Sequence, residues 1–294
     1  MQRKVVLFGS RGQLGVELDR AFRRRGYSVS GFDRQSVDVT DPTRIEHLIA
    51  SLDPYLVVNA TAYNMVDVAE SEPLAAYSVN ALAVRNLALA CRQADCRLVH
   101  FSTDYVFDGR KRTPYTEDDL PHPLGAYGVS KLAGELYAQA YLDRVLIVRT
   151  SGVFGTGALH TARGNFIELM LRLAKSGQTI RVVEDHVASP THAPALAERT
   201  ADLVERNAAG VFHLAGGTAI SWYHFAKLIF ETFGLHPECR AVTEREYRTA
   251  ARRPAYSALS NAKAEALGVA PMPSLAEAVS EYHAAREALV TAAG

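Results

Sequence analysis

Tyr127 and Lys131 lie four residues apart in the stretch AYGVSKLAGE (residues 126–135), which reads as the opening of a helix. Positions i and i+4 share one face of a helix, so a phenol and an ammonium would be neighbours there. A free phenol has a pKa near ~10, and an adjacent ammonium favours the phenolate. Such a pair can move a proton at a carbonyl or hydroxyl group. The chain has 13 tyrosines, however, and the same spacing suits an unreactive helical face.

A second set of candidate residues follows the first apolar run of the chain. The set forms a G-x-x-G-x-x-G turn and consists of Gly9, Ser10, Arg11, Gly12, Gln13, Leu14 and Gly15. Glycines let the backbone turn tightly and approach a pyrophosphate at the N-terminus of the next helix. The next apolar run ends at Asp33, at about the 20-residue distance where an acidic side chain binds ribose hydroxyls. The pattern predicts a dinucleotide site.

The choice of cofactor is balanced between two neighbouring residues. The carboxylate of Asp33 would repel a 2′-phosphate and favours NADH, whereas Arg34 could pair with that phosphate and favours NADPH. We therefore expect NADPH or NADH, with both accepted. Further cofactor contacts are expected where the second and third strands end, at Asp38, Val39, Ala60, Thr61, Ala62 and Tyr63. For the two alanines, close packing alone is the alternative.

The elements that must position these residues alternate in the first half of the chain. Short apolar runs occur at residues 4–9, 27–32, 55–61, 97–103 and 144–151, and helical stretches lie between them at 13–25, 42–52, 66–95 and 126–142. Continuous apolar strands that alternate with helices are typical of a parallel sheet covered on both faces. The sequence therefore predicts an α/β fold with a doubly wound, Rossmann-type parallel sheet.

The spacing becomes irregular beyond residue 151. Helices are expected at residues 164–176, 193–207, 221–233 and 274–290. We expect residues 1–151 to form the dinucleotide-binding domain, completed by strands near 179–185 and 210–216. No linker separates the halves, so residues 152–294 are expected to form mostly a smaller, mixed α/β substrate domain from interleaved segments.

Composition excludes several classes of protein. The chain has 294 residues and 32 basic against 32 acidic side chains, so no basic field points to nucleic acid. Its three cysteines have no metal-binding spacing and suit a reducing cytoplasm, so we expect no metal and a cytoplasmic location. The N-terminal apolar run is too short for a signal peptide, and no segment reads as a membrane span. The oligomeric state stays open, with a homodimer as one option.

Together the motifs resemble the dTDP-4-dehydrorhamnose reductase family of extended short-chain dehydrogenases/reductases. The matching stretches are NATAYNMVDVAESEPLAAYSVNA (59–81), STDYVFDG (102–109), YGVSKLAGE (127–135), GNFIELMLRLA (164–174), VVEDHVASPTHA (182–193) and RRPAYSALSNAK (252–263). The last three lie outside the expected cofactor domain, where a generic dehydrogenase would not match.

The resemblance implies NAD(P)H-dependent reduction of the C4 ketone of a dTDP-linked 6-deoxy-4-hexulose, as in dTDP-L-rhamnose biosynthesis. It implies that Tyr127 donates the proton, that Lys131 binds the nicotinamide ribose and lowers the tyrosine pKa, and that Thr103 polarises the carbonyl. Substrate contacts are implied at Thr103, Asp104, Tyr105, Gly152, Asn165 and Arg253. For the arginine, a surface role is the alternative.

Two positions bear on the exact substrate. Nucleotide-sugar 4,6-dehydratases carry an Asp-Glu pair after the threonine, but this chain has Tyr105 at the second position, which favours simple hydride transfer. The family has a tryptophan against the sugar where this chain has Gly152. Either Tyr105 or Phe154 covers the sugar instead, or the substrate is another nucleotide-linked 4-ketosugar.

An alternative of another class is a non-catalytic, dinucleotide-binding regulatory subunit. The regulatory subunit of methionine adenosyltransferase resembles these reductases and acts as a partner protein. The intact set of Thr103, Tyr127 and Lys131 speaks against this alternative, whereas Gly152 favours it.

Overall fold

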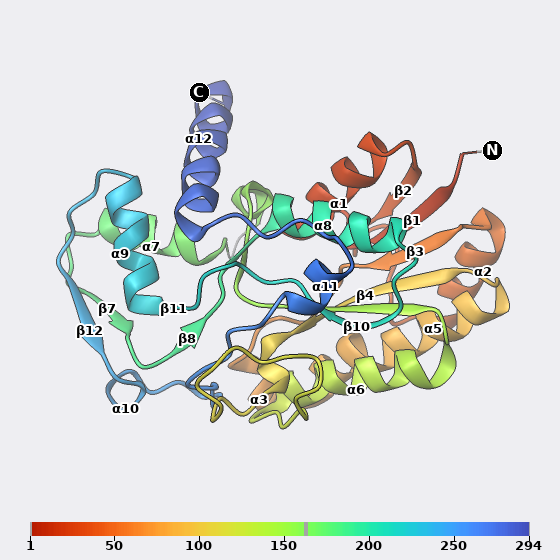
Figure 1. Cartoon of the computed structure of the whole chain (residues 1–294), viewed down its shortest axis with the longest axis horizontal. Coiled ribbons are helices and arrows are strands. Elements are labelled where there is room, and N and C mark those ends of the chain that lie inside the picture. Colours follow the sequence, from red (N-terminus) through yellow and green to blue (C-terminus); the bar gives the residue numbers. More distant parts are fainter. Residues whose placement is uncertain (1, 162–163, 294) are drawn as a thin grey trace.

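A six-stranded parallel sheet forms the larger part of the molecule (Figure 1). The computed structural model describes residues 2–161 and 164–293. The strands are β1 (Lys4–Phe8), β2 (Ser28–Phe32), β3 (Leu56–Asn59), β4 (Arg97–Thr103), β5 (Val145–Thr150) and β10 (Gly210–His213), in the order β10-β5-β4-β3-β1-β2. The order reverses between β1 and β3, and in doubly wound sheets ligands bind at such a switch point, beyond the carboxyl ends of the strands.

Helices cover both faces of this sheet, which confirms the predicted fold class. On one face, α1 (Gln13–Arg24) and α8 (Ala193–Glu205) enclose a core with β1, β3, β4 and β5. On the other face lie α2 (Pro42–Leu52), α5 (Ala83–Gln93) and α6 (Ala126–Tyr141). All seven residues of β4 are buried because it has helices on both sides. Asp41 caps α2, accepting a hydrogen bond from the Arg44 N–H, with Pro42 in the first helical position.

The single helix expected at 66–95 is divided into four pieces. They are α3 (Val68–Ser71), α4 (Pro73–Tyr77), the π-helical η1 (Ser78–Leu82) and α5. By length and composition alone, the 21 residues Pro73–Gln93 could cross a membrane, although the sequence analysis had expected no such stretch. Half of that stretch is buried inside the fold, where α4, η1 and α5 contact α6.

The strand expected near 179–185 does not complete the large sheet, so that part of the prediction is wrong. β7 (Ile180–Val183) pairs instead with β12 (Cys239–Val242) in a separate two-stranded sheet. The reason is its burial pattern, because Ile180 and Val182 are buried whereas Arg181 between them is exposed. A strand with one polar face cannot lie in a sheet covered on both faces. The segment near 210–216 does supply a strand of the large sheet, β10.

A smaller unit is built around a separate apolar core. It contains α7 (Phe166–Ala174), α9 (Trp222–Thr232), α12 (Leu275–Ala293) and β7. Short elements surround it or link it to the sheet: β6 (Val153–Phe154), β8 (Val187–Ala188), β9 (Thr191–His192), β11 (Ile220–Ser221), η2 (Asp104–Val106), η3 (Thr156–His160), α10 (Glu244–Tyr247) and α11 (Ala262–Ala266). α8 and β10 belong to the large sheet although they follow residue 151, and the division at that residue stays a prediction.

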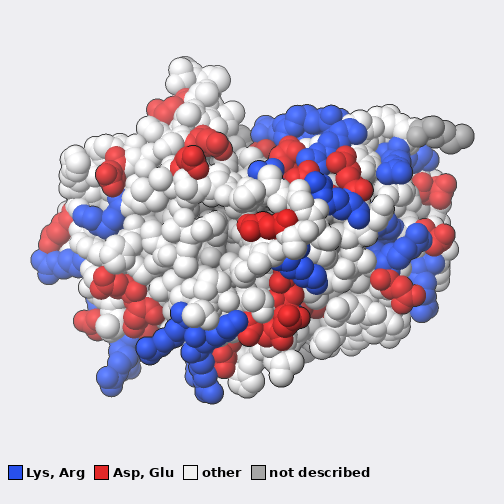
Figure 2. All heavy atoms as spheres, in the orientation of Figure 1, with Lys and Arg blue, Asp and Glu red and all other residues white. Residues whose placement is uncertain are grey.

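Charged side chains of both signs are interspersed over the face shown in Figure 2, in keeping with the formal net charge of zero. At the contact between α1 and α8, Arg25 pairs with Glu198 and Asp202, each at 2.8 Å, and Arg24 also pairs with Glu198. The basic side chains at this contact are therefore balanced by acidic partners.

Candidate active site

The glycine turn brings β1, β3 and α1 into close contact. Gly9 has a φ of +80°, and a side-chain carbon there would lie 2.8 Å from the carbonyl oxygen of Ala60. A carbon on Gly15 would lie 2.0 Å from the carbonyl oxygen of Gly9. Gly12, the N-cap of α1, has no side-chain hydrogen bond, so the first N–H groups of this helix are left for an anion. The crowding requires glycine, and the turn fits the pyrophosphate of a dinucleotide.

The acidic residue that follows β2 is already paired. Asp33 accepts hydrogen bonds from the N–H groups of Gln35 and Ser36 and lies 3.0 Å from the guanidinium of Arg11. The hydrogen bonds from Ser36 are the largest influence that holds the pKa of Asp33 below its usual value. Because Arg11 offsets the carboxylate and Arg34 is exposed beside it, this corner presents cations as well as an anion.

The other expected cofactor residues lie beyond the carboxyl ends of β2 and β3, except for Gln13 and Leu14 in the first turn of α1. Asp38 accepts from the Thr40 N–H and hydroxyl, while the Val39 side chain is buried in the core under α2. Thr61 donates to Asn59, and the Tyr63 N–H donates to the buried Asn80. The environments of the remaining four residues differ. Ala62 is exposed, whereas Ala60 and Leu14 pack against the core. The Gln13 side-chain amide donates to the Val153 carbonyl.

The helix predicted at residues 126–142 is α6, and it is held against β4. The ammonium of Lys131 is buried and donates to the carbonyl oxygen of Phe101 on β4 at 2.6 Å. Burial lowers the pKa of Lys131 to about 8, and the nearby carboxylate of Glu135 opposes that shift. At neutral pH the group still carries its proton for most of the time, so it remains a cation next to the helix turn that carries Tyr127.

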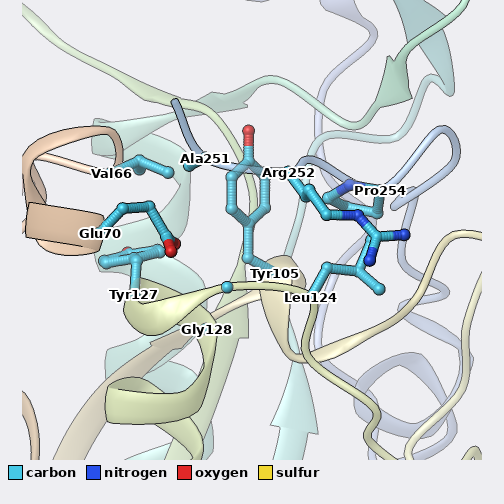
Figure 3. Close-up of a pocket in the computed structure, with 10 residues that line it drawn as sticks. Val66, Glu70, Tyr105, Leu124, Tyr127, Gly128, Ala251, Arg252 and Pro254 are labelled. Carbon is cyan, nitrogen blue, oxygen red and sulfur yellow. The ribbon is translucent and has the colours of Figure 1, made fainter. Parts of the chain in front are cut away.

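Tyr127 lines a small pocket with residues from three other parts of the chain (Figure 3). The Tyr105 ring stands edge-on to it, with centroids 6.0 Å apart. In Figure 3 Glu70 lies beside Tyr127, and Arg252 lies on the other side of Tyr105. The Glu70 carboxylate accepts from the Ala126 N–H at 2.8 Å and so caps the start of α6 from a different element. The structure therefore places Tyr127 at the wall of a cavity.

Thr103 and Asp104 are brought together at the end of β4. The Thr103 hydroxyl donates to Asp104, whose other oxygen accepts from Ser151 at 2.8 Å and Ser257 at 2.5 Å. Burial raises the pKa of Asp104 to about 6, against the opposing effect of these hydroxyls. Asp104 thereby links β4, the end of β5 and the C-terminal segment. Both of its carboxyl oxygens accept hydrogen bonds from hydroxyl groups of the protein.

Three expected substrate residues have structural partners. Asn165 caps α7, accepting from the Glu168 N–H. Arg253 forms a two-bond pair with Asp67, at 3.0 and 2.8 Å, and donates to the Ala251 carbonyl. Gly152 has a φ of +49°, and a side-chain carbon there would lie 3.1 Å from Trp222.

Several residues that organise the site were not found from the sequence. Glu70 and Asn80 support α6 and the segment after β3, and Glu135 forms a buried ion pair with Arg149. Only their positions within the matched stretches 59–81 and 127–135 could have indicated a role for Glu70, Asn80 and Glu135 at the site. Trp222 could have been noticed for another reason, because it is the single tryptophan of the chain.

Comparisons with known proteins cover both units of the fold. The family described as RmlD substrate binding domain matches residues 3–287. Spore coat polysaccharide biosynthesis protein SpsK of Bacillus subtilis is 38% identical over 279 residues, which cover 95% of this chain and 96% of that protein. dTDP-4-dehydrorhamnose reductase of Escherichia coli is 38% identical over 276 residues, covering 88% and 90%.

A solved structure agrees with these relatives. The crystal structure of dTDP-4-dehydrorhamnose reductase from Bacillus anthracis in complex with NADP has a TM-score of 0.91 and 32% identity, over 96% of this chain and 99% of that one. The match therefore includes the smaller unit as well as the large sheet. This chain belongs to the RmlD substrate binding domain family, the family of the dTDP-4-dehydrorhamnose reductases that its motifs resemble.

Proposed function

We propose that this protein is an oxidoreductase that reduces the C4 ketone of a dTDP-linked 6-deoxy-4-hexulose to the alcohol, with NADPH or NADH as the reductant. The observation that carries the proposal is the intact pair of Tyr127 on a cavity wall and Lys131 one turn later, in a chain similar over most of its length to dTDP-4-dehydrorhamnose reductase. A nucleotide-sugar substrate follows from the same similarity.

When bound, NADPH or NADH would be the source of the hydride that C4 of the sugar receives. The Tyr127 hydroxyl donates a proton to the C4 oxygen. The ammonium of Lys131 would favour the phenolate that forms when Tyr127 gives up its proton. The Phe101 carbonyl accepts from one of the three N–H donors of this ammonium, which leaves two for ribose hydroxyls. The Thr103 hydroxyl, at the end of β4, polarises the ketone. The glycine turn, together with Asp33 and the exposed Arg34, would hold the dinucleotide.

A second candidate is a reductase for a different nucleotide-linked 4-ketosugar. Gly152 and Trp222 favour it, because they shape the wall of the site in a way that the family pattern does not predict. A non-catalytic regulatory subunit is disfavoured, since such a protein has no need of Tyr127, Lys131 and Thr103 together.

The test of the proposed function is an assay of purified protein with dTDP-4-dehydrorhamnose and either reduced cofactor, with the product sugar identified. We expect ketone-dependent oxidation of the cofactor and a dTDP-L-rhamnose product. Oxidation only with another 4-ketosugar would support the second candidate. No oxidation with any such sugar would refute both.

The role of Tyr127 is tested within the same assay. Tyr127→Phe removes the proton donor and leaves the ring, so turnover should fall by about 10²–10⁴-fold, the usual contribution of a positioned general acid. Cofactor affinity should stay unchanged. Turnover near that of the wild type would refute the assignment.

We further propose a cytoplasmic homodimer with no nucleic-acid or membrane partner. Cys91 and Cys96 are free and buried, in keeping with a reducing compartment. Val129 and Leu136 are exposed seven residues apart on α6, and Leu74 is exposed on the neighbouring α4. These apolar side chains support a dimer through this face. Light scattering of the purified protein would give the mass directly.

A further inference from the structure

Gly152 lies immediately beyond the polar cluster at the end of β4. The preceding residue, Ser151, donates its hydroxyl to Asp104 at 2.8 Å, and Asp104 is bonded to Thr103. The Gly152 carbonyl accepts from the Thr191 N–H at 3.2 Å, which fixes the backbone where it turns with a φ of +49°. This position is at the carboxyl edge of the sheet, where the substrate of a doubly wound fold binds.

The edge of the Trp222 indole occupies the space next to Gly152. A side-chain carbon added at Gly152 would lie 3.1 Å from Cη2 and 3.8 Å from Cζ2 of this ring. The distances are too short for most side chains at position 152 unless the indole moves. The absent side chain of Gly152 is therefore matched by a tryptophan that comes from α9, 70 residues later in the chain.

Packing from the smaller unit holds the indole in place. Its ring centroid lies 4.7 Å from that of Phe166 and 6.1 Å from that of Phe225. The backbone N–H of Trp222 donates to the His186 carbonyl at 3.2 Å, which fixes the start of α9. The residue is nevertheless only half-buried. A rigid, partly exposed indole at the edge of a site offers an apolar surface to the C–H groups of a sugar ring.

Building on the proposed function, we propose that Trp222 forms the wall against which the hexose of the nucleotide sugar lies, and that it determines which sugar is accepted. The smaller unit supplies this wall through α9, whereas β4 supplies Thr103 and α6 supplies Tyr127. The Gly152 position is then kept free of a side chain so that the indole can approach.

Intrinsic fluorescence tests the position of the ring directly, because Trp222 is the only tryptophan. Wild-type protein without cofactor is titrated with dTDP-L-rhamnose and separately with dTDP. We expect a saturable change in tryptophan emission with the sugar nucleotide that dTDP alone does not produce. Calorimetric binding of dTDP-L-rhamnose without a change in emission would overturn the proposal.

Kinetics test the energetic role. Trp222→Ala should raise KM for dTDP-4-dehydrorhamnose about tenfold, with kcat within about twofold of the wild type, because loss of an aromatic contact is worth about this factor. Trp222→Phe should recover part of the loss. Tyr223→Ala is the matched control, since its ring contacts His224 on the same helix, and its KM should not change.

The outcomes separate this inference from the proposed function. If wild-type protein shows no ketone reduction, the proposed function fails, and the fluorescence titration still reports whether a sugar nucleotide reaches Trp222. If wild-type protein is active and Trp222→Ala keeps its KM, the inference is refuted while the function stands. Should Trp222→Ala fail to fold, the wild-type titration decides alone.

Discussion

Asp104 and Lys131 are charged side chains with almost no exposure, and the pKa of each is moved towards the neutral form by burial. The pKa of Asp104 rises to about 6 and that of Lys131 falls to about 8. In place of water, protein groups bind the charged form of each side chain. Three hydroxyls donate to the Asp104 carboxylate, and the Phe101 carbonyl accepts from the Lys131 ammonium. The chemistry around Tyr127 therefore depends on groups that water reaches poorly.

Asp104 gives the stability of the protein a pH dependence of known sign. Its pKa is raised from 3.8 to about 6 on folding, so the folded state holds the proton more tightly than the unfolded chain. The resulting stability is complete below pH ~4 and is lost as the pH rises through ~6, by about 2–3 kcal/mol. In Asp104→Asn this loss is absent.

The test is urea unfolding of wild type and Asp104→Asn near pH ~4 and pH ~7. We expect the variant to gain stability relative to the wild type at the higher pH. A difference in stability between the two proteins that is the same at both pH values would contradict the raised pKa of the buried Asp104 carboxyl group. Other titrating groups cancel, since both proteins share them.

Arg34 should control the cofactor preference. It is exposed next to Asp33, whose charge Arg11 already offsets, so it is available to a 2′-phosphate. Arg34→Ala should weaken NADPH binding about tenfold and leave NADH binding nearly unchanged, because a charge-assisted pair with phosphate is lost. Arg110→Ala, another exposed arginine, is the control.

Titrations of both cofactors with the wild type complete this experiment. Dual use predicts affinities that differ by less than about a thousandfold, or ~4 kcal/mol. A larger difference, or an equal effect of Arg34→Ala on both cofactors, would contradict the expectation.

At the scale of elements, α6 is fixed at several points along its length. Glu70 of α3 bonds the N–H of Ala126 at its start, and Lys131 reaches β4. One turn later, Glu135 accepts from Arg149 of β5 at 2.9 and 2.7 Å, and both side chains are buried. The orientation of Tyr127 is therefore set by bonds to three neighbouring elements.

Breaking the buried pair should destabilise the protein strongly. Arg149→Met leaves the Glu135 carboxylate buried without its partner, which should cost about 3–5 kcal/mol in the free energy of unfolding. Replacing both residues, with Glu135→Leu and Arg149→Met together, should restore most of that loss. Urea unfolding of the single and double variants measures both effects. A single variant within about 1 kcal/mol of the wild type would contradict this account.

The elements of the large sheet could be predicted because their signals are local. Continuous apolar runs located β1 to β5. β7 was misplaced because a four-residue strand has the same apolar content in either sheet. Only the exposure of the Arg181 side chain distinguishes a strand of the large sheet from one of the small sheet. This exposure depends on which strand β7 pairs with.

At the scale of the whole molecule, the site depends on contacts between distant parts of the chain. Asp67 pairs with Arg253 across 186 positions, and Asp104 with Ser257 across 153. The sequence could supply candidate site residues, because glycine spacing and strand ends are local patterns. It did not predict the internal partners of Asn165 and Arg253, since a polar side chain shows no partner until the fold is known. The close approach of Trp222 to Gly152 could not be predicted for the same reason.

The most direct test of the central claim follows a single atom. The protein is incubated with dTDP-4-dehydrorhamnose and NADPH that carries deuterium at both C4 positions of the nicotinamide, and the product is examined by NMR and mass spectrometry. The account predicts one deuterium per product molecule, on C4 of the hexose, formed at a rate that Tyr127→Phe lowers by about 10²–10⁴-fold. A product without deuterium at C4, or no product at all, would contradict it.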